Sequence, residues 1–246
     1  MTEIAGAHVD LWVVDPATVA RPDVVARTLA WLTAEERRRH DAFRFDVHRH
    51  EYLVTRALAL SVLAAYARTA PSGLRFERNA YGCPRLASHP DIDFNLTNAA
   101  SLVALLVSRH GVVGVDVEPI ARADDILEVA DSVFAKAELA ELRALPTIEA
   151  RRARGLDLWT LKESYIKARG MGLSVPLDKF AFDFDHADPH VTIDPSLQDE
   201  AARWAFSRRD VDGHRISACV DVSRRAAAPE VRVRRIVPFV DVVDPD

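Results

Sequence analysis

Cysteine is scarce in this chain of 246 residues, which contains only Cys83 and Cys219. Two thiols cannot form a disulfide scaffold, and these two lack the spacing of a zinc site. We therefore expect a protein of the reducing cytosol, hence a cytoplasmic one, whose thiols are inert because no Cys-His arrangement stands out. A metal ion, if one is bound, is expected to be held by oxygen atoms.

Long hydrophobic runs are also missing. The most apolar stretch, residues 99–107, is far shorter than the ~20 residues that cross a bilayer, so we interpret it as a buried strand and expect no contact with a membrane. The first eight residues carry no basic leader before an apolar run, so neither a signal peptide nor a transit peptide is expected. A glycine-rich phosphate loop is missing too, since Gly170 and Gly172 are more simply a helix end.

The overall composition is that of a folded protein, with 49% apolar and 28% charged residues. The length fits either one large domain or two small halves that share an interface. A formal net charge of -5 argues against a general nucleic-acid binder, so no nucleic acid is expected among the partners.

Hydrophobic periodicity predicts strands and helices that follow each other twice in a similar order. Strands are expected at 8–15, 74–78, 94–97, 102–108, 112–117, 180–184, 203–208 and 216–220, with 102–108 and 112–117 forming a hairpin. Helices are expected from the capping box Thr33/Glu36 through 40, and at 46–68, 126–134, 136–145 and 148–169. We therefore predict an α/β (α+β) fold of two similar pseudo-symmetric halves, residues 1–112 and 113–246, each a small sheet packed with helices.

Two carboxylates lie two positions apart in the segment Gly114-Val-Asp-Val-Glu118. Alternate residues of a strand share a face, so Asp116 and Glu118 are expected to point the same way. Carboxylates this close repel each other unless a cation or a proton lies between them, and oxygen ligands suit Mg²⁺. The alternative is a solvated strand edge that binds no metal.

A second cluster lies in the predicted helix 148–169. Residues four apart share a helix face, so Trp159, Glu163 and Lys167 line up. The structural alternative is a core tryptophan beside a surface Glu-Lys pair worth about 0.3–0.5 kcal/mol. If this stripe lies beside the first motif, Glu163 adds a third carboxylate to a metal site, and Lys162 and Lys167 provide positive charge for phosphates.

Together the two motifs resemble the paired signatures of the 4′-phosphopantetheinyl transferases, in particular the longer type typified by the surfactin-synthetase-activating enzyme. The resemblance covers about residues 37–184. Further segments match in the family's order, namely Tyr81-Gly82-x-Pro84, Phe94-Asn95-Leu96-Thr97, Phe134-x-x-x-Glu138 and Gly170-x-Gly172-Leu173 with Pro176-Leu177.

The resemblance implies transfer of the phosphopantetheine arm of coenzyme A to a serine of an acyl or peptidyl carrier protein, with release of 3′,5′-ADP, in secondary metabolite biosynthesis. It implies that Mg²⁺, held by Asp116, Glu118 and Glu163, grips the pyrophosphate and aligns the serine. Glu163 is implied as the residue that accepts the serine proton. Lys162 and Lys167 are implied to bind phosphate oxygens, and Lys167 to stabilise the departing 3′,5′-ADP.

The resemblance also implies a basic pocket in the first half for the 3′-phosphate and adenine of coenzyme A. The alternatives for its arginines are a solvated basic helix face, or a surface that steers an acidic carrier protein. The candidates for binding coenzyme A in this half are Arg37, Arg39, Arg49, Arg56, Arg85, Thr97 and Asn98.

Two positions depart from the family pattern. Cys83 stands where the family usually has lysine, and Asn98 stands where it usually has histidine. Both changes remove positive charge, but Asn98 can still donate a hydrogen bond and Arg85 lies two residues from Cys83. We therefore expect weaker or differently arranged binding of coenzyme A, with activity retained.

Two other functions remain open. The same three carboxylates could serve a Mg²⁺-dependent phosphohydrolase or nucleotide-transferring enzyme. A catalytically silent homologue could instead bind carrier protein or coenzyme A without turnover. We expect a monomer with coenzyme A and Mg²⁺ in the cleft between its halves, because the two-half pattern makes the chain self-contained.

Overall fold

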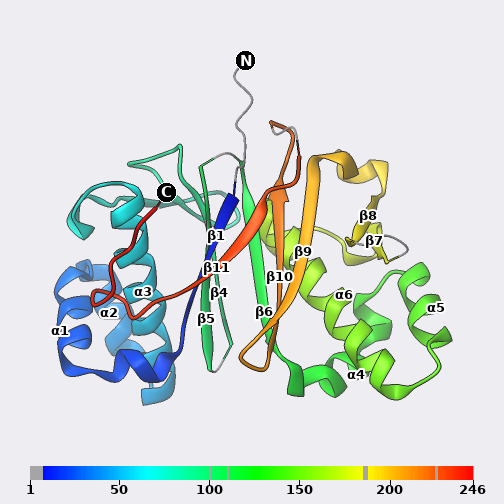
Figure 1. Cartoon of the computed structure of the whole chain (residues 1–246), viewed down its shortest axis with the longest axis horizontal. Coiled ribbons are helices and arrows are strands. Elements are labelled where there is room, and N and C mark those ends of the chain that lie inside the picture. Colours follow the sequence, from blue (N-terminus) through cyan, green and yellow to red (C-terminus); the bar gives the residue numbers. More distant parts are fainter. Residues whose placement is uncertain (1–7, 100, 110, 185–187, 225–226, 246) are drawn as a thin grey trace.

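Two sheets meet in the middle of the molecule, and each is covered on its outer face by helices (Figure 1). The computed structural model describes residues 8–99, 101–109, 111–184, 188–224 and 227–245. The helices on one side are α1 (Pro22–Trp31), α2 (Ala34–Ala42) and α3 (Asp46–Tyr66), and those on the other are α4 (Ala123–Val133), α5 (Lys136–Ala144) and α6 (Ile148–Arg169). The predicted α/β (α+β) fold is confirmed.

The first sheet has the strand order β11-β1-β5-β4 and the second has the order β6-β10-β9. All neighbours are antiparallel except β11, which runs parallel to β1. The strands are β1 (His8–Val14), β4 (Asp93–Ala99), β5 (Leu102–Ser108) and β11 (Glu230–Arg235) in the first sheet, and β6 (Val113–Pro119), β9 (Trp204–Val211) and β10 (His214–Asp221) in the second.

Smaller elements connect the main ones. Two short antiparallel hairpins pair β2 (Phe76–Arg78) with β3 (Pro84–Leu86), and β7 (Phe180–Asp183) with β8 (His190–Ile193). Single-turn 3₁₀ helices lie at Pro16–Ala20, Pro71–Gly73, Ile120–Arg122, Gly172–Ser174, Leu177–Lys179, Pro195–Leu197 and Ala201–Arg203.

The two halves repeat one topology. Each runs from a strand through helices, of which the longest is the last, to a short hairpin and then to two more strands. In each half the first strand pairs with the last, so β1-β5-β4 corresponds to β6-β10-β9. The prediction of two similar halves is therefore confirmed by strand order. The last strand, β11, stands outside this repeat, because it returns to the first sheet.

Local chemistry explains where several elements begin and end. The capping box predicted for Thr33 and Glu36 is present at the start of α2. Gly170 ends α6 with a positive φ of 62°, a conformation that glycine adopts without steric cost. The predicted hairpin between β5 and β6 is wrong, because the two strands lie in different sheets. Each is an apolar run that fits a buried strand, and such a run does not specify its partner.

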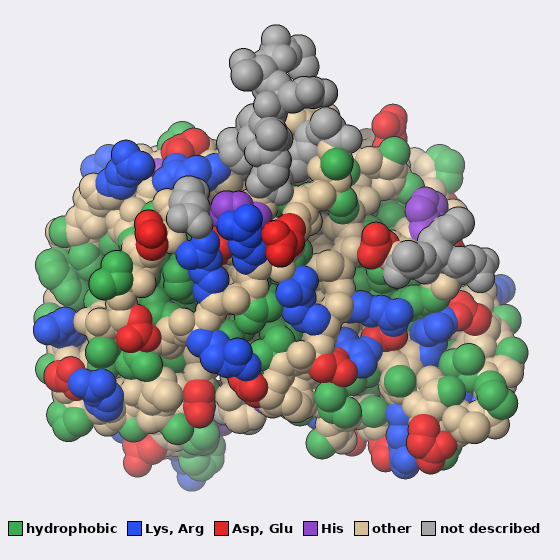
Figure 2. Space-filling view, in the orientation of Figure 1, with side chains coloured by type: hydrophobic (Ala, Val, Ile, Leu, Met, Phe, Trp, Pro, Cys, Tyr) green, Lys and Arg blue, Asp and Glu red, His purple; other side chains and the backbone are tan. Residues whose placement is uncertain are grey.

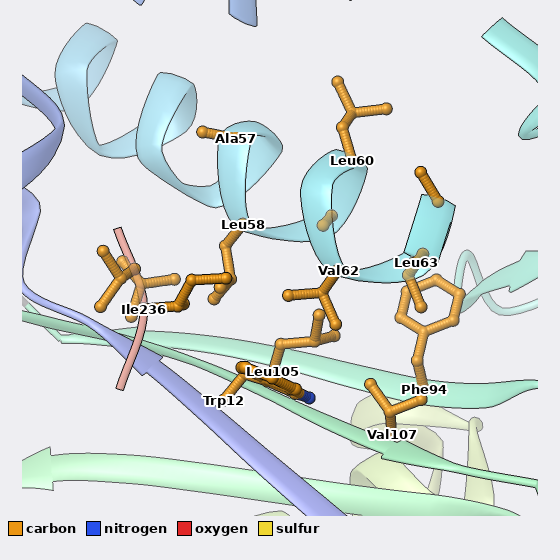
Figure 3. Close-up of a cluster of buried hydrophobic side chains, with 14 of the residues drawn as sticks. Trp12, Ala57, Leu58, Leu60, Val62, Leu63, Phe94, Leu105, Val107 and Ile236 are labelled. Atoms are coloured by element: carbon orange, nitrogen blue, oxygen red, sulfur yellow. The ribbon is translucent and has the colours of Figure 1, made fainter. Parts of the chain in front are cut away.

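Three groups of apolar side chains hold the layers together. In the first half, Leu58 and Val62 of α3 point onto Trp12 and Leu105 of the sheet (Figure 3). A second group packs the helices of the other half on their own sheet. The third lies between the sheets and includes Val9, Leu11, Val115, Ile216 and Ala218. Burial of both sheet faces fixes the two halves against each other.

The edges of the two sheets meet along β4 and β6, where the backbone N–H of Val115 donates a 3.0 Å hydrogen bond to the buried Asn95 side chain. On the face shown in Figure 2, basic side chains gather over the central strands with acidic ones between them. No helix in the described part of the chain combines the length and the apolar character needed to cross a membrane.

Candidate active site

The site begins with an unusually close contact between β6 and α6. A Cβ atom added to Gly114 would collide with the backbone of Ser164 and Ala168, so a residue without a side chain lets the helix lie directly on the strand. This contact sets the carboxylates of β6 beside the stripe of α6 that carries Glu163 and Lys167. The sequence pattern predicted both motifs, and the structure places Lys167 of the second motif against Asp116 of the first.

Asp116 is the most buried of the three carboxylates, with 5% of the residue exposed. Its Oδ1 accepts hydrogen bonds from Lys167 Nζ at 2.6 Å and from Thr97 Oγ1 at 3.3 Å. Lys167 Nζ also donates to Thr97 Oγ1 at 3.0 Å. Because Thr97 comes from β4 of the first half, the site lies at the junction of the halves. The other oxygen, Oδ2, is buried and has no hydrogen-bond partner among the described residues.

Glu118 has a donor on each carboxylate oxygen. The indole N–H of Trp159 donates to Oε1 at 3.1 Å, and the guanidinium of Arg122 donates to Oε2 at 2.8 Å. Burial raises the pKa of Glu118, the negative charge of Asp116 raises it further, and Arg122 opposes both effects. Trp159 is therefore a partner of the site, a role that its apolar ring did not indicate in the sequence.

Glu163 is half-buried and makes no hydrogen bond or ion pair with the described residues. Burial raises the pKa of Glu163, the charges of Asp116 and Glu118 raise it further, and Lys167 lowers it. The three acidic side chains therefore share one neighbourhood. The Glu-Lys surface pair considered as the structural alternative is not formed, because Lys167 pairs with Asp116 instead.

A divalent cation is compatible with these donors. Among the described residues, no three acidic, histidine or cysteine side chains converge closely enough to form a ready metal cluster. The ammonium of Lys167 supplies the positive charge beside Asp116. Yet the buried Oδ2 of Asp116 lacks a partner, and the carboxylate of Glu163 is unpaired. Oxygen donors of this kind, two of them uncommitted, fit Mg²⁺.

Comparison with known proteins identifies the family of the chain. The family model for the 4′-phosphopantetheinyl transferase superfamily matches residues 112–219, which contain both motifs. The 4′-phosphopantetheinyl transferase Sfp of Bacillus subtilis is 30% identical over 78% of this chain and 84% of its own. The L-aminoadipate-semialdehyde dehydrogenase-phosphopantetheinyl transferase of Eremothecium gossypii is 35% identical over 78% of this chain and 71% of its own. The chain belongs to the 4′-phosphopantetheinyl transferase superfamily.

Other relatives extend the match along the chain. The phosphopantetheinyl transferase of a Thraustochytrium species is 29% identical over 94% of this chain and 85% of its own. Among solved structures, the holo-[acyl-carrier-protein] synthase of Thermotoga maritima aligns with 46% of this chain and 63% of its own, at 19% identity and a TM-score of 0.37.

Lys162 of this transferase does not face the carboxylates, and its predicted role in phosphate binding is corrected. Its side chain is 2% exposed and pairs with Glu138 at 2.8 Å. The same ammonium donates to the backbone oxygens of Leu177 at 2.8 Å and Phe180 at 2.7 Å. With three acceptors for three donors, no N–H of Lys162 remains for a phosphate. Burial lowers the pKa of Lys162, and Glu138 opposes that shift.

Two of the predicted arginines, Arg37 and Arg49, make hydrogen bonds within the first half. The guanidinium of Arg37 donates to the backbone oxygen of Leu29, and that of Arg49 to Phe43 and Asp46. These contacts tie together the segments around α2. Arg85 on β3 and Asn98 on β4 are exposed. All of these positions stay predictions as ligands of coenzyme A.

Arg39 and Arg56 approach a common residue, Tyr52 of α3. Arg56 pairs with Glu36 at 2.6 Å, and Arg39 lies over the Tyr52 ring at 5.5 Å. The charge of Arg78 acts on the same group, together with Arg39 and Arg56. Arg78 was missed in the sequence analysis, although it stands three residues before Tyr81-Gly82.

The turn that carries Cys83 in the first half contacts the end of α6 in the second half. The Asn79 side chain donates to the backbone oxygen of Gly170 at 2.7 Å, and a Cβ on Gly170 would lie 3.6 Å from Cys83. The Tyr81-Gly82 segment of the first half is thereby set beside the end of α6, three residues after Lys167. Burial raises the pKa of the Cys83 thiol, so this cysteine is a poor nucleophile.

Proposed function

We propose that this transferase moves the 4′-phosphopantetheine arm of coenzyme A to a serine of an acyl or peptidyl carrier protein, with Mg²⁺, and releases 3′,5′-ADP. One observation carries the proposal. Two carboxylates from β6 and one from α6 share a neighbourhood with Lys167, at the junction with β4 of the other half. A substrate that carries both a pyrophosphate and a nucleotide suits a site with groups from both halves.

The chemistry of phosphoryl transfer requires alignment and neutralisation of charge more than covalent catalysis. Asp116 and Glu163, with Glu118 as a third candidate, would hold Mg²⁺, which neutralises pyrophosphate charge when bound. Glu163 makes no hydrogen bond or ion pair with the described residues, so it is also the candidate to accept the proton of the serine hydroxyl.

In the transfer step the serine O–H bond breaks, its proton passes to Glu163 directly or through water, and the serine oxygen forms a bond to the β-phosphorus. The bond from that phosphorus to 3′,5′-ADP breaks. Lys167, a quarter of whose side chain is exposed, stabilises the charge on the departing phosphate.

The first half is proposed to bind the nucleotide end of coenzyme A. Arg39, Arg56 and Arg78 bring positive charge to the surroundings of Tyr52, and Thr97 links this half to Lys167. Arg85 and Asn98 are further candidates because both are exposed. We further propose that the protein is a monomer in the cytoplasm that serves secondary metabolite biosynthesis. The monomer is supported by the contribution of both halves of this one chain to the site.

Intact-mass spectrometry tests the proposal. The protein is incubated with coenzyme A, Mg²⁺ and several apo carrier proteins, with a matched sample that contains a chelator. We expect a mass gain equal to the phosphopantetheinyl group, which the chelator abolishes. No gain on any carrier would contradict the transferase. In that case, release of phosphate without a carrier would indicate a phosphohydrolase, and binding of coenzyme A alone would indicate a silent homologue.

A further inference from the structure

Arg122 forms an ion pair with one of the proposed metal ligands. It follows Glu118 by four residues, is the last residue of the 3₁₀ turn Ile120–Arg122 and is the N-cap of α4. Its Nη1 lies 2.8 Å from Oε2 of Glu118, and its Nε lies 3.6 Å from Oδ2 of Asp125. The Arg122 side chain is 47% exposed, whereas that of Glu118 is 13% exposed.

We propose that Arg122 is a positioning residue that sets the affinity of the site for its divalent cation, by competing with the ion for Glu118. The proposal rests on the metal dependence proposed above. A guanidinium and a metal ion seek the same carboxylate oxygen, and a unit positive charge close to the site also repels the cation. Removing Arg122 therefore strengthens cation binding.

The surroundings of Glu118 direct this competition to one of its oxygens. Oε1 is held by the indole N–H of Trp159, which packs against the apolar core of the second half. Oε2 is held by the half-exposed Arg122. The carboxylate therefore has one firm contact, which orients it, and one exchangeable contact.

Asp125 gives Arg122 a second partner on the same side. It is exposed, lies in the first turn of α4 and is already 3.6 Å from Nε of Arg122. When a cation takes Oε2 of Glu118, the guanidinium loses that ion pair but keeps Asp125 as a partner and can move closer to it. We therefore infer that Asp125 favours cation binding by accepting Arg122.

Binding of Mn²⁺, a paramagnetic substitute for Mg²⁺, tests the proposal without coenzyme A, carrier protein or turnover. Electron paramagnetic resonance counts the free ion directly. We expect Arg122→Gln to bind Mn²⁺ about 2–5 times more tightly than wild type, the range given by an exposed ion pair of roughly 0.4–1 kcal/mol. We expect Asp125→Asn to bind it more weakly, because Arg122 then stays on Glu118.

Matched controls come from the neighbouring ion pair of Arg152 with Asp124, whose Nε to Oδ1 distance is 2.7 Å. Arg152→Gln on α6 and Asp124→Asn in the first turn of α4 make the same changes of charge without touching Glu118. Equal or weaker Mn²⁺ binding by Arg122→Gln, or an Asp125→Asn effect no larger than that of Asp124→Asn, would overturn the proposal.

Wild-type protein that binds no Mn²⁺ would overturn the proposal together with the metal site. The mass-spectrometric assay separates these cases, because transfer with unchanged Mn²⁺ affinities removes only the role of Arg122. The thermal midpoint of each variant in a chelator shows whether it is folded, and Arg122→Lys, which keeps the charge, is expected to bind Mn²⁺ less tightly than Arg122→Gln.

Discussion

Glu163 is a residue whose charge destabilises the metal-free protein. Burial raises its pKa first, and Asp116 and Glu118 raise it further. A carboxyl group with a raised pKa in the folded state binds protons more readily than it does in the unfolded chain. The stability of the folded state therefore falls as the pH rises through that pKa. This loss of stability is expected where carboxylates lie close together without the cation that would neutralise their charges.

We expect Glu163→Gln to be more stable than wild type at neutral pH in a chelator. The midpoint of thermal unfolding should rise by roughly 2–4 °C for each kcal/mol of repulsion relieved. The difference should disappear at acidic pH, where the wild-type carboxyl is protonated in both states. Thermal scans over a pH series measure this, and a lower midpoint for Glu163→Gln at neutral pH would contradict the electrostatic account.

Lys162 and Glu138 form a buried pair that ties three elements together. Glu138 accepts hydrogen bonds from the backbone N–H groups of Ala135 and Phe182, and Lys162 binds the loop before β7. Lys162→Ala should lower the free energy of unfolding by about 3–5 kcal/mol, because it leaves a charged carboxylate buried alone. Denaturant unfolding measures the loss.

A second variant separates a structural role of Lys162 from a role in substrate binding. Adding Glu138→Gln to Lys162→Met should recover part of the lost stability, since neither charge then remains buried. The affinity for coenzyme A should follow the folded fraction. A folded Lys162 variant with a selectively raised KM for coenzyme A would support the predicted contact of Lys162 with a phosphate.

Residues that share one face of a strand or helix could be predicted from their spacing in the sequence. Asp116, Glu118, Glu163 and Lys167 belong to this class: Lys167 contacts Asp116, and the charges of the other three act on Glu163. Lys162 was misjudged because a lysine is usually exposed, and its partner Glu138 lies on another helix. Contacts between residues distant in sequence leave no periodic pattern, so the hydrogen bond from Thr97 to Asp116 could not be predicted either.

At the scale of elements, the crossing of β6 and α6 positions the whole site. The backbone atoms that face Gly114 belong to a helix packed on both sides, so they cannot move aside cheaply. We expect Gly114→Ala to lower the free energy of unfolding by about 1–3 kcal/mol or more, and to weaken Mn²⁺ binding by displacing α6. Gly213→Ala is a useful comparison, because that glycine has open space around it and responds only through its φ of 75°.

The elements themselves were easier to predict than their partners. The capping box of α2 and the glycine that ends α6 are local signals, and both are present. The pairing of β5 with β6 was wrong, because strand partners depend on the path of the chain. Strand β11 was missed although Val231 and Val233 alternate with arginines, because two apolar residues are too few to make a clear strand signal.

At the scale of the whole molecule, the first half contains a counterpart of the site. Val9-Asp10-Leu11 on β1 matches Val115-Asp116-Val117 on β6, and Tyr66-Ala67-Arg68 matches Lys167-Ala168-Arg169. The Tyr66 hydroxyl donates to Asp10, as Lys167 does to Asp116. Arg234 of β11 pairs with Asp10 at 2.8 Å. In the second half a bound cation could balance the charge of Asp116, whereas in the first half Arg234 balances the charge of Asp10.

This counterpart predicts that Arg234 contributes to stability and not to transfer. Arg234→Met should lower the free energy of unfolding by about 1–3 kcal/mol, because Asp10 loses a charged partner while buried. Asp10→Asn in the same chain should recover most of the loss. Arg235→Met, which breaks an exposed pair with Asp212, should change stability by less than about 0.5 kcal/mol. Equal losses of unfolding free energy for Arg234→Met and Arg235→Met, measured by denaturant unfolding, would contradict a particular role of the Arg234–Asp10 pair in stability.

If β6 and α6 build one metal-dependent transfer site, transfer requires Glu163. The rate of carrier-protein mass gain is measured for wild type, Glu163→Gln and Glu149→Gln, the last changing an exposed acid in the first turn of the same helix. We predict a loss of at least about 100-fold in kcat for Glu163→Gln, the scale of a proton-accepting group, and wild-type rates for Glu149→Gln. Full activity in folded Glu163→Gln would contradict the account.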